Sequence, residues 1–181
     1  TSLGRLEVRR GNMAAAQTMR RTGLEIRESV GDDEGVLQSL ISLGRLRFER
    51  GDRPGAAQTW SQALARAREM ADRRSECHVL HSLAETHLVE GRLDTAQDLL
   101  ARAKEISREL GDRRSALRIE LLLGRLAMRR GDDDARYVLE GALSLAESQG
   151  SKESMAYVHR SLGQLRALTL YDGKAPVGPS T

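Results

Sequence analysis

The sequence is poor in the residues that hold small β-rich or secreted domains together. It contains one cysteine, Cys77, and only 3% aromatic residues among 181. One cysteine excludes an internal disulfide, and so few aromatic residues argue against a β-sandwich or barrel. Of the three prolines, Pro54 stands where a helix would begin, and the other two lie close to the C-terminus. This composition favours exposed amphipathic helices.

Signals for export, membrane insertion and catalysis are also lacking. There is no signal peptide, twin-arginine leader or apolar run of spanning length, which predicts a cytoplasmic protein without membrane contact. The 29 lysines and arginines are matched by 26 acids, and no basic run exceeds a pair. Such a balance argues against direct nucleic-acid binding. No phosphate-binding glycine loop or nucleophile motif is present, so we predict neither an enzyme nor a cofactor.

Glycines recur along the chain at a fixed spacing. Gly11, Gly51, Gly91 and Gly131 are forty residues apart. A fixed period of this length is typical of a repeat array, in which each unit buries its apolar face only against its neighbours. We therefore expect a partial first repeat at 1–31, repeats at 32–71, 72–111 and 112–150, a capping helix at 151–171, and a disordered tail at 172–181.

Each repeat predicts two helices. In the second repeat, an apolar stripe predicts a helix from Asp33 to Arg50, and Gly51 is expected to adopt the left-handed conformation after it. Asp52 is the candidate N-cap of a second helix that ends near Ala71. Asp32, Asp72 and Asp112 are expected to cap the first helix of their repeats. The fourth repeat is one residue short, which indicates a deletion around Asp132 to Asp134.

The repeat also carries a code of small and large residues that is similar to that of the tetratricopeptide repeat. Leu43-Gly44, Gly51, Ala56, Trp60 and Ala63 fill it completely, and Leu83-Ala84, Gly91, Ala96, Leu100 and Ala103 nearly do. The sequence departs from the family's pattern in its forty-residue period and in the tyrosine of the first helix, which is replaced by Arg47, His87 and Ala127. HEAT-type repeats share the longer period but lack this code. The resemblance implies an all-α fold, a right-handed α-solenoid of antiparallel helix hairpins.

The long period resembles the C-terminal arrays of bacterial transcriptional regulators of the signal-transduction ATPase and antibiotic-pathway classes. There the array is the sensing or partner-binding arm. The chain begins at Thr1 without a methionine, and Leu3-Gly4 occupies a position that is mid-helix in later repeats, so we expect it to be a piece of a longer array. The resemblance implies a scaffold for a protein or peptide. Two alternatives stay open, a sensor of a small molecule or peptide pheromone and a self-association module that forms homo-oligomers.

In arrays that resemble this one, the first helix of each repeat lines a concave groove. The resemblance places there Arg5, Arg9, Gln38, Ile41, Arg45, Glu49, His78, His81, Glu85, Arg118, Leu121, Arg125, Arg129, Tyr157, Arg160 and Gln164. Arg5, Arg45 and Arg125 are equivalent positions, and a column of arginines would attract carboxylates or phosphates, for example those of an acidic peptide. The alternative is a solvated face whose arginines pair with Glu49 and Glu85.

Two clusters raise the question of a metal site. His78, His81 and Glu85 share one helical face next to Cys77, but the His-Glu-x-x-His motif is missing. The acids at 132–134 lack the alternating ligands of a calcium loop. We therefore predict no metal.

Overall fold

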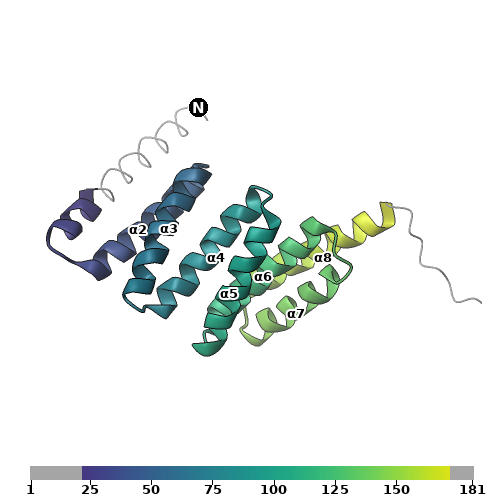
Figure 1. The fold of residues 1–181 in the computed structure, drawn as a ribbon. Helices are drawn as coiled ribbons and strands as arrows, with labels where there is room; N and C mark the ends of the chain where they lie inside the picture. The colour runs from purple at the N-terminus through teal and green to yellow at the C-terminus, as the bar shows by residue number, and fades with distance from the viewer. Residues whose placement is uncertain (1–21, 172–181) are drawn as a thin grey trace, which may run out of the picture. The chain divides into compact units, whose positions relative to one another are not determined.

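The computed structural model describes residues 22–171, with side chains as far as residue 167, and this part of the chain is helical with no strand (Figure 1). The helices group into two compact units, of which the first ends at Glu90 and the second begins at Gly91. None of the described helices is long and apolar enough to cross a membrane. The expected tail, 172–181, lies outside the described residues.

The first unit contains helical residues 22–29, then α2 (Asp33–Glu49), α3 (Arg53–Glu69) and α4 (Arg73–Val89). The second contains α5 (Leu93–Glu109), α6 (Arg113–Arg130), α7 (Ala135–Ser148) and α8 (Lys152–Tyr171). Short turns join helices that pack against each other, α2 with α3 and α6 with α7, which makes each pair an antiparallel hairpin. The predicted all-α solenoid of helix hairpins is therefore confirmed.

Aspartate caps begin most of these helices. Asp32, Asp52, Asp72 and Asp112 accept hydrogen bonds from the backbone N–H groups of Gly35, Gly55, Ser75 and Ser115, at 2.9 to 3.1 Å. The predicted caps are therefore confirmed. Helices α5 and α7 follow Arg92 and Asp134, whose side chains make no capping bond.

The missing residue of the fourth repeat shortens the start of α7. This helix has 14 residues, whereas α3 and α5 have 17 each. Residues 131–134 form the turn before it, and Asp134 has helical backbone angles with ψ of 0°, whereas ψ at the N-caps of α2 to α6 lies between 71° and 88°. A deletion in this turn would account for the shorter α7, whose N-cap Asp134 makes no capping bond of the kind that Asp52 makes at the start of α3.

The hairpins are held together where a residue without a side chain faces a large one. A Cβ atom added to Gly44 of α2 would lie 2.4 Å from Nε1 of Trp60 on α3, and one added to Gly124 of α6 would lie 2.5 Å from Cδ2 of Leu139 on α7. Trp60 is only 4% exposed, and its Nε1 donates to the carbonyl of Ile41 at 3.3 Å. Glycine therefore permits a helix approach that alanine would obstruct.

Arg47 stands where the tetratricopeptide pattern has a tyrosine, and it performs a structural role there. Its Nη1 donates to Oγ1 of Thr59 at 2.6 Å and to the carbonyl of Gly55 at 3.1 Å. The guanidinium thus links α2 to α3 through hydrogen bonds, which explains how the hairpin closes without the aromatic residue.

We predict that Gly44→Ala destabilises the first unit by about 1–3 kcal/mol, because the buried indole ring has no room to move away. Urea unfolding followed by the fluorescence of Trp60, the single tryptophan, reports on this unit. Gly163→Ala is the matched control, because Gly163 is the equivalent residue of α8 and a Cβ atom there would meet nothing within 4 Å. Since α8 belongs to the second unit, the unfolding of this variant is followed by helical circular dichroism. This variant should stabilise α8 by up to about 1 kcal/mol, and an equal loss in both variants would refute the packing argument.

A second prediction concerns Ala71, which follows α3 in the left-handed conformation with φ of 53°. Glycine occupies the equivalent place after the other described helices that end in this way, at Gly51 and Gly111 among others. Ala71→Gly should raise the free energy of unfolding by about 0.5–1 kcal/mol, since it relieves strain that a Cβ atom imposes. Ala65→Gly, an exposed position inside α3, should lower it by about 1 kcal/mol. Two losses of similar size would contradict the prediction.

Candidate partner-binding face

The predicted groove residues fall on the first helix of each hairpin and on α8. Arg5 and Arg9 lie outside the described residues. The others divide between the two units, with those of α2 and α4 in the first and those of α6 and α8 in the second. We describe each set within its own unit.

In the first unit these residues are of mixed charge and partly inaccessible. On α2, Gln38, Arg45 and Glu49 are exposed, whereas Ile41 is 5% exposed. On α4, His78 and Glu85 are half-buried and His81 is 5% exposed. The rings of His78 and His81 stack with centroids 5.1 Å apart. A partner could therefore reach little of Ile41 or His81, and it would meet two acids, Glu49 and Glu85, and one arginine.

In the second unit the same positions are cationic. Arg118 and Arg129 on α6 are exposed, Arg125 is half-buried, and α8 adds exposed Arg160 and Gln164. Helices α6 and α8 contact each other, so the two stripes are neighbours within the unit. Leu121 and Tyr157 are half-buried between them, packed against a core that includes Leu139 and Val158.

Arg114 extends this stripe by one turn and was missed by the sequence prediction. It is exposed and lies four residues before Arg118, a spacing that places both on one side of a helix. Of the charged residues in α6, six are arginines and one is an acid, Glu120. Its carboxylate is paired with Nζ of Lys104 on α5 at 2.8 Å. We define the α6–α8 arginine face as Arg114, Arg118, Arg125, Arg129 and Arg160.

The residues around Cys77 do not gather into a metal site. Cys77 is buried, and its neighbours on α4 are the stacked histidines already described. In the described part of the chain, no three histidine, cysteine or acidic side chains lie close enough to hold a metal ion. The packing of α4 accounts for Cys77 as a small core residue.

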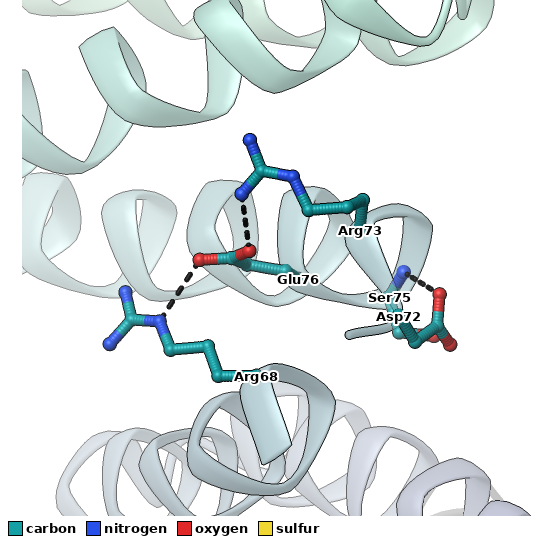
Figure 2. Close-up of polar contacts among 5 residues, drawn as sticks. All are labelled: Arg68, Asp72, Arg73, Ser75 and Glu76. Carbon is teal, nitrogen blue, oxygen red and sulfur yellow. Dashed lines mark hydrogen bonds and ion pairs between the residues drawn. The ribbon is translucent and has the colours of Figure 1, made fainter. Parts of the chain in front are cut away.

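A buried carboxylate joins α3 to α4 in the first unit, and sequence reasoning did not identify it. Glu76 is 5% exposed. Figure 2 shows its carboxylate between two guanidinium groups, with Nε of Arg68 at 2.9 Å and Nη1 of Arg73 at 2.7 Å. The spacing of Arg73 and Glu76 was a visible signal. The contact with Arg68 depends on how α3 packs against α4.

Opposing effects act on the acids of this cluster. Burial raises the pKa of Glu76, but the hydrogen bonds and charges of Arg68 and Arg73 together outweigh it, so the pKa lies below the ordinary 4.5. Burial likewise raises the pKa of Asp72, and its bonds to Ser75 bring that pKa below 3.8. A carboxyl group whose pKa is lower in the folded state stabilises the fold at pH values above its unfolded-state pKa. This contribution is lost as the pH falls through the folded-state pKa.

Comparison with known proteins adds information on the fold. No protein-family model matches the sequence, and no curated protein matches it. Solved structures do match. BtubC (BKLC) from P. vanneervenii has a TM-score of 0.69 at 18% identity, and the match covers 99% of this chain and 82% of that one. A putative kinesin light chain of Podosopora anserina, with nearly identical TPR-like repeats, has a TM-score of 0.65 at 18% identity and coverages of 96% and 95%.

The fold is that of the TPR-like repeat proteins. Repeat folds of this kind present extended surfaces to other proteins and generally serve as scaffolds. At 18% identity the likeness concerns the arrangement of the backbone. Which side chains contact a partner has to be argued from the residues of this chain.

We predict that Glu76→Gln destabilises the first unit by about 1–2 kcal/mol at neutral pH, because an amide makes weaker bonds to Arg68 and Arg73. The loss should shrink as the pH falls from 4.5 through the lower folded-state pKa of Glu76, since the wild-type carboxylate becomes protonated over this range. Urea unfolding monitored by Trp60 fluorescence over this range measures the difference. Glu69→Gln, an exposed acid of α3, is the control. A deficit for Glu76→Gln that stays constant with pH would argue against the ionised cluster.

Proposed function

We propose that this chain is a protein- or peptide-binding scaffold and that the α6–α8 arginine face holds an acidic segment of its partner. The observation that carries this proposal is the charge of the face itself. Five arginines line neighbouring stripes of two helices that contact each other. Guanidinium groups bind carboxylates in a planar, bidentate geometry, which favours Asp and Glu side chains or a chain terminus.

The length of the face indicates the length of the segment. Arg114 and Arg129 are fifteen residues apart on α6, a distance of about 22 Å along the helix axis. An extended peptide covers about 3.3 Å per residue, so roughly seven residues would span the face. Exposed Arg160 on α8 could hold a carboxylate on the second side of such a segment. Half-buried Leu121 and Tyr157 would offer apolar contact between the charges.

The first unit contributes less to this proposal. Its corresponding stripes combine one arginine, Arg45, with two acids, Glu49 and Glu85, so they carry no excess of positive charge. Binding within the second unit alone requires no continuous groove through the array. The acidic segment would be attracted to this unit from a distance, and its association should weaken with salt because the arginines are exposed.

We further propose that the array is the partner-binding arm of a larger bacterial transcriptional regulator in the cytoplasm. The support is the long repeat period and its resemblance to the arrays of such regulators. Sequencing the gene around this segment tests it, because an adjoining nucleotide-binding or DNA-binding module is the expected finding.

The arginine face can be tested with a fluorescein-labelled peptide of alternating glutamate and leucine, measured by fluorescence anisotropy. The double variant Arg118→Glu, Arg160→Glu should weaken binding by about tenfold or more, since two attractive charges become repulsive. Neither wild-type guanidinium makes an ion pair in the described part of the chain, so the fold should be retained.

The control is Arg102→Glu, Arg108→Glu, which changes the net charge equally on the exposed surface of α5. It should reduce binding only slightly, through the change in long-range attraction. A peptide of alternating lysine and leucine should not bind the face. Equal losses in the two double variants, or no binding of the acidic peptide to the wild type, would refute the proposed face.

A further inference from the structure

A cavity of about 400 Å3 lies in the second unit among α5, α6 and α7. Leu123, Leu126 and Ala127 of α6 and Val138 of α7 form its apolar part. Polar side chains from all three helices and from the turn between α6 and α7 surround this part. The lining thus combines a small apolar area with many charged and polar groups, a composition that suits a long side chain with a charged end.

The cavity arises where the repeat exchanges two leucines for an ion pair. Lys104 and Glu120, which both line it, stand forty residues after Leu64 and Leu80. Leu80 is fully buried at its place between helices, whereas Lys104 and Glu120 pair through Nζ and Oε1 at 2.8 Å. Gly141 of α7 also lines the cavity, and a Cβ atom there would meet nothing within 4 Å. Gly141 therefore leaves this part of the lining without a side chain.

Most of the charges around the cavity neutralise one another. Lys104 pairs with Glu120, Arg130 pairs with Asp94, and Glu140 pairs with Arg136 at 2.8 Å. The acids that remain are Asp132 and Asp134 of the turn, neither of which makes an ion pair or caps α7 in the described part of the chain. The cavity therefore keeps an excess of negative charge in a protein whose net charge is +3.

Tyr137 completes the cavity with an aromatic ring. It is 79% exposed, which is unusual for a large apolar side chain, and it lines the cavity beside Val138. The faces of aromatic rings attract cations, and the attraction adds to that of nearby carboxylates. A ring this exposed is also available to cover a side chain that enters from outside.

We infer that this cavity takes the side chain of a lysine or arginine from a protein partner. The aliphatic stem would lie on Leu123, Leu126 and Val138, as the stems of long basic residues do on apolar surface. The charged head would lie between the ring of Tyr137 and the two carboxylates of the turn. A glutamate of similar length would be repelled by those carboxylates, and a leucine would leave them without a counter-charge.

This site is separate from the α6–α8 arginine face. On a helix with 3.6 residues per turn, Arg118, Arg125 and Arg129 lie on one side of α6, and Leu123 and Ala127 lie on the other. The inference therefore goes beyond the proposed function, and either can fail without the other. If both hold, the second unit selects a basic residue on one side and an acidic segment on the other.

The test uses the full chain labelled with nitrogen-15 and three capped tripeptides, in which alanines flank an arginine, a glutamate or a leucine. Backbone amide shifts should change around the cavity with the arginine peptide, in the millimolar range expected for one side chain. Its affinity should exceed that of either other peptide by about tenfold. Equal shifts with the leucine or glutamate peptide, or none with any of the three, would overturn the inference. Tighter binding of free arginine would overturn it as well, because it would indicate a small-molecule site.

Two variants distinguish the loss of the binding site from the loss of the fold. Gly141→Leu should fill the mouth of the cavity and abolish the shifts, while replacement of glycine inside α7 raises the melting temperature. The double variant Asp132→Asn, Asp134→Asn should bind the arginine peptide about fivefold to tenfold more weakly. Asp98→Asn, an exposed acid of α5 outside the cavity, should leave it unchanged. Unaltered binding in Gly141→Leu would place the peptide elsewhere and refute the site.

Discussion

The close approach of paired helices, made possible by a glycine opposite a large side chain, is the constraint on which this protein depends. Gly44 lies against Trp60 and Gly124 against Leu139, at distances that leave no room for a Cβ atom. The two contacts lie two repeat periods apart, one in each unit, and the repeat between them has the small residue Ala84 at the equivalent position. Because they fix one side of the first helix of each hairpin, the other side is left to vary. The surface chemistry of the repeats can therefore diverge while the backbone stays the same.

That divergence explains why the two units differ in charge although their helices are equivalent. The stripes of α2 and α4 combine arginine with glutamate, and two of their members, Ile41 and His81, are buried in this unit. The stripes of α6 and α8 carry five arginines. The buried residues of the repeat do not determine this difference in charge, because replacing an exposed glutamine with an arginine alters no buried contact. Charge at these positions is a property of individual repeats, so a partner could recognise one unit of the array.

The fold was predictable because its signals are local and repeated. The forty-residue spacing, the aspartates at 32, 72 and 112, and the glycines after most of the helices predict where helices begin and end. Contacts between helices that do not recur from repeat to repeat could not be predicted from the sequence. Glu76 of α4 pairs with Arg68 of α3. The cavity beside Tyr137 is lined by Lys104 and Glu120, which stand where the preceding repeat has leucines, and its formation depends on how the helices pack. The groove residues rest on resemblance and charge, and they stay a prediction until a partner is measured.

Glu120 connects the two sides of α6. As the only acid of this helix, it could have neutralised one of the six arginines. It instead occupies the position of a buried leucine in the preceding repeat, where Lys104 of α5 holds its carboxylate. Glu120 lies on the cavity side of α6, away from the arginine stripe. Together with Lys104 it lines the cavity at positions where the preceding repeat has Leu80 and Leu64. Substitutions on the two sides of α6 thus place a cationic face on one side and a cavity on the other, which is how an array of equivalent hairpins acquires a unit with its own specificity.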